Sequence, residues 1–373
     1  MKKSLIALAV TAAVAVPATA SAGASTKFFG YSQITAAVGG AAPADGLRFG
    51  ADRIRLGYKV KNGSAFGKLQ VDFMKADSSG TPTCEKADFV ANVTHDSSGS
   101  PSTTTSEALT SCSGSTNIGV PEILKDAVVG LKINNMAKVS AGVFKTPVGM
   151  DFNTSGKKLD ITKRGMEKKF VLERAAGLMV SGRKIAGGFG YDVGIFNPAG
   201  RSSSVTGPGV PGQNNAYAAR AMYDMAGLHL EASAGWSENA ANNADGKGAA
   251  YKVWDVAGRY KTGPITAKFE YISGQDIKGK VGDDEAVWYL HGGYKINKMI
   301  EAVARFYSAS YSPATGSSSS LSNLYIGANV FFAKHDARIQ VNYVVAGGDT
   351  DTYNGKSGGY TDNVLLAQFQ VGF

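Results

Sequence analysis

A regular alternation of apolar and polar residues runs through most of this chain, and it constrains the fold more than any other feature. The segment Arg53–Val60, RIRLGYKV, alternates in this way, and the segments 265–271 and 338–343 repeat the pattern. Successive side chains of a β-strand point to opposite faces of the sheet. Each segment therefore predicts a strand with one apolar face and one charged or polar face.

The pattern recurs often enough to predict an all-β protein with sixteen strands. Short connections such as Asn62-Gly63 and Ala226-Gly227 alternate with long ones such as 75–122 and 146–174. This rhythm over an even number of strands is typical of a transmembrane β-barrel, in which turns gather at one end and loops at the other. The predicted strands are residues 27–38, 49–60, 65–74, 123–134, 137–145, 175–184, 188–197, 215–224, 227–237, 250–261, 264–274, 285–296, 299–310, 321–333, 336–346 and 361–373.

Alternation alone does not distinguish this barrel from a soluble β-sandwich, which would turn its apolar faces inward. Three features favour the barrel: strands of roughly nine to thirteen residues, which are longer than usual, a last strand that ends at Phe373 without a tail, and aromatic residues near strand ends. Such residues form girdles at the membrane interfaces. The candidate girdle residues are Phe29, Tyr58, Phe73, Trp236, Trp254, Tyr260, Trp288 and Tyr294. We predict a 16-stranded antiparallel transmembrane β-barrel with short periplasmic turns and long extracellular loops.

The N-terminus has the layout of a secretory signal peptide. Lys2 and Lys3 precede the apolar run 5–16, and Ala20-Ser21-Ala22 follows it. We predict a signal peptide over residues 1–22 and one barrel domain over 23–373. No later apolar run reaches the roughly 18 residues of a membrane-spanning helix. Export combined with a barrel predicts a location in an outer membrane.

The net charge limits the kinds of binding partner that we expect, and the two cysteines predict a disulfide. The formal net charge of +9 falls to +7 without Lys2 and Lys3, which favours anionic solutes and the lipopolysaccharide surface. No nucleic-acid partner is expected, because no helix-turn-helix, zinc-finger or RNA-binding motif organises the cations. Cys84 and Cys112 share a Ser/Thr/Gly-rich stretch, and in an exported chain they predict a loop disulfide.

The signal peptide, the sixteen-strand rhythm and the terminal Phe373 together resemble Gram-negative outer-membrane porins. Within the chain, Gly142–Gly149, GVFKTPVG, preceded by Leu124-Lys125-Asp126-Ala127, is similar to the strand that leads into the constriction loop of the phosphate-selective porin O and P family. The resemblance implies a homotrimer whose Phe373 is the signal read by the barrel-assembly machinery. It also implies that the third long loop, residues 146–174, folds into the barrel and narrows the pore.

This candidate constriction loop is rich in cations. The acids Asp151, Asp160, Glu167 and Glu173 do not balance them. As a group in a constriction they would create a positive potential, which low-dielectric walls strengthen. The candidate constriction residues are Lys145, Lys157, Lys158, Lys163, Arg164, Lys168, Lys169 and Arg174.

The polar strand faces add further cations to the predicted lumen. Many of them would pair with acids across the lumen, and the excess predicts a preference for phosphate, sulfate or small organic acids. A phosphate-specific ladder of arginines is not predicted, because the loop contains more lysine, which lacks the bidentate fork of arginine. The candidate lumen residues are Arg53, Arg55, Lys59, Lys68, Arg220, Arg259, Lys268, Arg305 and Arg338.

Other functions stay open at this stage. A general, non-selective porin fits the same pattern, and the long loop 76–121 suits an adhesin or a phage receptor. An outer-membrane barrel enzyme would need a catalytic His, but none of the four histidines lies in a recognisable catalytic motif. We therefore expect no enzymatic activity, no cofactor and no metal site.

Overall fold

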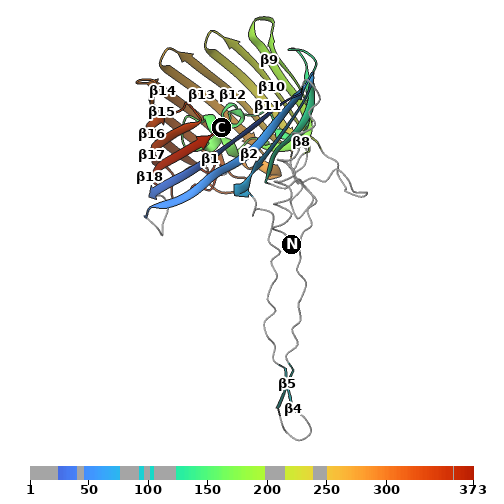
Figure 1. Ribbon diagram of the computed structural model, residues 1–373. Helices are drawn as coiled ribbons and strands as arrows, with labels where there is room; N and C mark the ends of the chain where they lie inside the picture. The colour runs from blue at the N-terminus through green and yellow to red at the C-terminus, as the bar shows by residue number, and fades with distance from the viewer. Residues whose placement is uncertain are drawn as a thin grey trace.

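Sixteen strands form a closed antiparallel barrel in which each strand pairs with its neighbours along the chain and β1 closes against β18 (Figure 1). The computed structural model describes residues 24–39, 46–75, 92–95, 101–104, 123–197, 215–237, 250–355 and 357–373. All sixteen predicted strands are confirmed, with boundaries within three residues. The barrel strands are β1 (Ala24–Gly39), β2 (Arg48–Asn62), β3 (Ala65–Asp72), β6 (Leu124–Lys132), β7 (Lys138–Lys145), β8 (Arg174–Ile185), β9 (Phe189–Phe196), β10 (Ala216–Met225), β11 (Leu228–Ser237), β12 (Tyr251–Thr262), β13 (Ile265–Gln275), β14 (Asp284–Lys295), β15 (Ile300–Ser312), β16 (Ser319–Phe331), β17 (Ala337–Gly348) and β18 (Val364–Gly372).

The long connection between β3 and β6 differs from the prediction. We expected a long loop over 75–122 and no strands within it, but β4 (Asn92–His95) and β5 (Pro101–Thr104) pair there as a two-stranded antiparallel sheet. Two other predictions, the signal peptide over residues 1–22 and the disulfide between Cys84 and Cys112, lie outside the described residues.

The barrel buries its polar strand faces and exposes its apolar ones. In β13, Lys268 and Glu270 are buried, whereas Phe269 between them is 38% exposed and Ile265, at the start of the strand, is 47% exposed. A soluble sandwich would show the opposite arrangement, so this observation excludes it. The outer surface is apolar as lipid contact requires.

The outward rings include most of the predicted girdle, but Phe29 is an exception. Trp236 is 46% exposed and Tyr294 is 54% exposed on the outer face. In β1 the outward ring is Phe28, which packs near Tyr58 with a centroid separation of 6.3 Å. Phe29 therefore faces the lumen, and its assignment to the girdle was wrong.

Tight turns gather at one end of the barrel, at the upper rim in Figure 1. Between β10 and β11, Ala226 and Gly227 both have positive φ, 44° and 88°, as a two-residue hairpin turn of the primed type requires. Short turns of outer-membrane barrels face the periplasm. No helix among the described residues is long and apolar enough to cross a membrane.

The connection from β7 to β8, residues 146–173, enters the barrel. It contains the single helical turn α2 (Met150–Asn153) and the 3-10 turns η3 (Gly156–Lys158) and η4 (Met166–Lys169), drawn as green ribbon inside the barrel in Figure 1. We call residues 146–173 the inner loop. Its apolar side chains are almost fully buried in the main hydrophobic cluster of the molecule, which also includes inward residues of the wall. These loop residues are Val148, Phe152, Ile161, Met166 and Phe170.

Candidate pore lining

Side chains of the barrel wall hold the inner loop largely through hydrogen bonds to the main chain of the loop. Arg338 Nη1 donates to the Leu159 carbonyl at 2.7 Å, and Asn329 Nδ2 donates to the Asp160 carbonyl at 3.0 Å. Because each bond uses a loop carbonyl, it fixes the path of the loop without requiring a particular loop side chain. The other wall amides that donate to loop carbonyls are Gln33 to Gly156, Gln340 to Leu159, Gln368 to Thr162 and Gln370 to Lys157, at 3.1–3.2 Å.

Loop N–H groups are held in the same way. The two carboxylate oxygens of Glu270 accept bonds from the Met150 and Asp151 amides at 3.0 Å each, at the start of α2. Asn342 Oδ1 accepts from the Thr162 amide at 3.0 Å. The polar residues of the lumen wall thus satisfy buried backbone groups of the loop.

Asp160 carries the main side-chain anchor. Its Oδ2 lies 2.5 Å from Lys268 Nζ and 3.0 Å from Arg305 Nη2. Arg305, which is 1% exposed, also lies 3.4 Å from Asp151 Oδ2. Burial would raise the pKa of Asp160, but the charges of Lys268 and Arg305 lower it below its ordinary value. The carboxylate therefore stays ionised and offsets two wall cations.

Several cations predicted for the loop bind loop or wall groups. Lys145 Nζ donates to the carbonyls of Phe152 and Thr154, and Arg164 donates to the carbonyls of Asp151 and Thr154. Burial and nearby arginines lower the pKa of Arg164 to about 10, which leaves it charged at neutral pH.

The remaining loop cations differ in their surroundings. Lys157 pairs with Asp336, Lys163 lies 3.2 Å from Asp52, and Arg174 lies 3.0 Å from Asp126. Lys158 and Lys168 are exposed, and the side chain of Lys169 is outside the described part of the chain.

The predicted wall cations fall into two groups. One group has specific partners and, except for Lys268, borders neither open space: Arg53 bonds to Gln33, Arg220 to Asp192 and Glu231, Lys268 and Arg305 to Asp160, and Arg338 to Leu159. The others border open space, although Arg55 also pairs with Asp72 and Lys68 with Asp126. The residues of this second group are Arg55, Lys59, Lys68 and Arg259.

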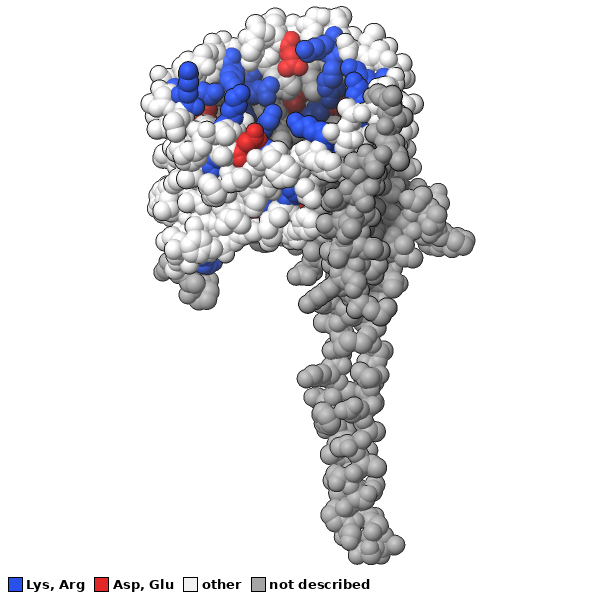
Figure 2. Space-filling model, in the orientation of Figure 1, with Lys and Arg blue, Asp and Glu red and all other residues white. Residues whose placement is uncertain are grey.

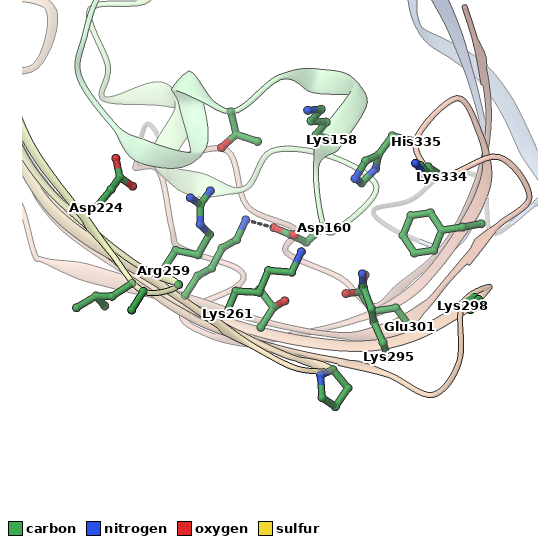
Figure 3. A pocket seen from close by; sticks show the side chains of 18 of the residues that line it. Lys158, Asp160, Asp224, Arg259, Lys261, Lys295, Lys298, Glu301, Lys334 and His335 are labelled. Atoms are coloured by element: carbon green, nitrogen blue, oxygen red, sulfur yellow. Dashed lines mark hydrogen bonds and ion pairs between the residues drawn. The ribbon is translucent and has the colours of Figure 1, made fainter. Parts of the chain in front are cut away.

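One open space, the β10–β17 cavity, lies between the inner loop and the short turns of β10 to β17. Its volume is about 1210 Å³. Arg259 and Lys261 extend from the wall toward the part of the loop that carries Lys158 (Figure 3). Burial and the neighbouring Arg338 and Lys158 lower the pKa of His335 to about 4, so it is neutral at pH 7. Cations outnumber acids here: Lys158, Arg259, Lys261, Lys268, Lys295, Lys298 and Lys334 face Asp160, Asp224 and Glu301.

A second space, the β1–β8 cavity, lies between the inner loop and strands β1 to β8. Its volume is about 670 Å³, and Lys158 borders both cavities. Figure 2 shows Lys and Arg side chains gathered around the hollow at the short-turn end, with few acidic side chains among them. The cations of this cavity are Lys27, Arg55, Lys59, Lys68, Lys138, Lys145, Lys157, Lys158 and Arg174, and its acids are Asp126 and Asp336.

The sequence analysis missed part of this lining. Lys27, Phe29, Phe66 and Lys138 border the β1–β8 cavity but were not assigned to the lumen. The signal was available for Phe66, because it shares the parity of Lys68 in β3, and side chains two residues apart lie on one face.

One histidine of the described chain lies between two carboxylates. His229 lies between Asp224 and Glu231, at 2.8 and 2.9 Å. No three His, Cys, Asp or Glu side chains among the described residues gather as metal ligands would.

The overall barrel is similar to several solved structures. OmpT of Vibrio cholerae, in its trimer form, matches with a TM-score of 0.60 at 14% identity, over 94% of this chain and 100% of that one. OmpF of Salmonella typhi, in complex with daunomycin, matches with a TM-score of 0.63 at 12% identity, over 93% and 97%. The anion-selective porin of Comamonas acidovorans matches with a TM-score of 0.59 at 13% identity, over 94% and 100%.

The fold is that of an outer-membrane porin. No family model matches the sequence, and no curated protein matches it either. The porin fold is therefore established through the shape of the barrel and its apolar outer surface, which agree with the predicted location in the outer membrane of a Gram-negative bacterium.

Proposed function

We propose that this porin-fold protein forms a water-filled channel for small hydrophilic solutes and prefers anions. The observation that carries the proposal is the charge of the space around the inner loop. Nine cations and two acids border the β1–β8 cavity, and seven cations and three acids border the β10–β17 cavity. A narrow space between low-dielectric walls concentrates such a field and attracts counter-ions.

The same proposal extends to the resemblance with the phosphate-selective porin O and P family. The stretch Gly142–Gly149 ends β7 and begins the inner loop, and Lys145 within it binds two loop carbonyls. Most cations that border the two cavities are lysines, which suit anions in general rather than the bidentate recognition of phosphate. Phosphate is therefore proposed as one of several permeant anions.

The anion preference is tested by the reversal potential of the purified protein in a planar bilayer with a KCl gradient. We expect the potential to lie toward the equilibrium potential of chloride. Lys158→Glu should reduce the anion-to-cation permeability ratio by at least about fivefold, since a single charge about 4 Å from an ion already changes its energy by about 1 kcal/mol in water, and the substitution reverses the charge.

Lys184→Glu is the matched control, because Lys184 is exposed at the same end of the barrel but borders neither cavity. Potassium preference of the unmodified channel would exclude the anion proposal. Equal effects of the two substitutions would show that Lys158 lies away from the ion path.

The proposal includes a homotrimer, supported by the likeness to OmpT in its trimer form. Native mass spectrometry in detergent should give three times the monomer mass. It includes no catalytic step, and hydrolysis of lipid or peptide by the purified protein would contradict that part.

A further inference from the structure

Four phenylalanines border the β1–β8 cavity, and two of them lie where the strand pattern calls for polar residues. Phe29 of β1 and Phe66 of β3 both border this cavity. The interior of a porin barrel is polar, and its aromatic residues normally gather at the outer interfaces. Rings inside the lumen therefore need a separate explanation.

Each ring lies over a glycine of the neighbouring strand. Phe29 pairs with Gly57 and Phe66 pairs with Gly130. A Cβ atom at Gly57 would lie 2.7 Å from Cζ of Phe29, and one at Gly130 would lie 2.5 Å from Cζ of Phe66. The rings are thus packed against bare backbone on one side, which leaves their other side toward the cavity.

Lysine ammonium groups lie close to both rings. Lys59 Nζ is 5.3 Å and Lys68 Nζ is 5.8 Å from the ring centroid of Phe29, and Lys138 Nζ is 4.6 Å from that of Phe66. Lys68 also pairs with Asp126, whereas Lys59 and Lys138 form no ion pair with any residue that the structure describes. Positive charge and an aromatic face are therefore available together at two places.

We propose that this part of the wall binds organic anions that carry an aromatic ring, such as aromatic carboxylates. The inference rests on the proposed anion channel and narrows its solute class. The ligand ring would stack on Phe29 or Phe66, and its carboxylate would accept hydrogen bonds from Lys59 or Lys138. A lysine side chain is flexible enough to move from the ring face to the carboxylate.

The two phenylalanine rings would not increase the affinity for small inorganic anions. An anion with a saturated ring would gain affinity only from the apolar area that it buries. Offset stacking of two aromatic rings stabilises a complex beyond the effect of the buried apolar area. The extra contribution corresponds to about twofold to tenfold higher affinity. If the rings served only to cover Gly57 and Gly130, aromatic and saturated acids of equal size and charge would bind alike.

The test is block of the KCl current through single channels by benzoate, compared with cyclohexanecarboxylate as an acid of similar size and equal charge. We expect benzoate to reach half-block at a concentration about twofold to tenfold lower. Phe29→Leu and Phe66→Leu keep an apolar side chain but remove the ring, and each should bring benzoate closer to cyclohexanecarboxylate. Phe28→Leu, on the lipid-facing side of the same strand, is the matched control and should leave the difference unchanged.

The outcomes separate this inference from the proposed function. Equal block by the two acids in a chloride-preferring channel would overturn the aromatic site and leave the anion channel standing. A potassium-preferring reversal potential would overturn the anion channel itself. If a leucine variant fails to fold, seen as a missing heat-modifiable band on a gel, the comparison of the two acids in the unmodified channel still decides.

Discussion

At the scale of single residues, Glu167 is a buried acid of the inner loop whose ionisation depends on whether the loop is closed. It is fully buried in η4. Burial, and then the negative charge of Asp151, raise the pKa of Glu167 from 4.5 to about 7, while Arg305 acts in the opposite direction. The folded loop therefore holds a proton that an opened loop would release at neutral pH.

This difference predicts a loop that is less firmly held at higher pH. Below about pH 4.5 the Glu167 carboxyl is protonated in both the closed and the open loop, so it does not destabilise the closed loop. As pH rises to about 7 the open state is increasingly favoured, and above it the cost levels at no more than about 3 kcal/mol. Hydrogen exchange of amides 166–170, corrected for intrinsic rates, should show more frequent opening at pH 8 than at pH 5.

Glu167→Gln should remove this pH dependence, because the amide does not ionise. Glu173→Gln is the control, since Glu173 is an exposed acid in the same loop. Protection that is equal at the two pH values in the unmodified protein would contradict the argument.

The sequence predicts which side of the barrel wall a side chain faces where neighbouring residues differ in polarity. It does not where the neighbours are alike. Arg53 and Arg55 alternate with Ile54, which is 37% exposed, so parity assigns the two arginines to the opposite face. Phe28 and Phe29 are adjacent aromatics, so parity alone does not say which one faces lipid, and the choice of Phe29 was wrong.

At the scale of elements, the inner loop depends on Asp160 to neutralise Lys268 and Arg305. Asp160→Asn would leave Lys268 beside the β10–β17 cavity without this partner, and it would leave Arg305 with Asp151 and the Tyr307 hydroxyl. Removing one partner of a buried ion pair costs about 3–5 kcal/mol, so we also expect weaker protection of the loop amides. The reversal potential in a KCl gradient should move further toward the chloride equilibrium potential.

Asp362→Asn serves as the control for this experiment, because Asp362 is exposed and borders neither cavity. A shift toward potassium in Asp160→Asn would contradict the argument.

Strand boundaries were predictable because alternation and turn residues are local signals. The pair β4 and β5 was missed because residues 92–95, NVTH, and 101–104, PSTT, have no apolar alternation. The pairing of cations could not be predicted either. Lys268 and Asp160 are far apart in the chain, and they meet only because the barrel closes and the loop crosses its interior.

At the scale of the whole molecule, the excess of positive charge around the two cavities should act over a distance set by salt. The screening length is about 30 Å at 0.01 M ionic strength and about 3 Å at 1 M. We therefore expect the chloride preference to be strong in a gradient of 0.1 to 0.01 M KCl and weaker in one of 1 to 0.1 M. Reversal potentials corrected for ion activity measure this change, and a preference independent of salt would point to specific binding instead of a long-range field.

The wall holds the inner loop chiefly through backbone carbonyl and amide groups, and this has a consequence for how such a channel changes over time. A substitution at Lys157, Lys158 or Lys163 would leave the bonds from Gln33, Arg338 and Gln368 in place. The side chains of the loop can therefore vary while the contacts between its backbone and the barrel wall stay the same. Natural or engineered substitutions could therefore change the charges along the passage one side chain at a time, while the loop stays in the same position.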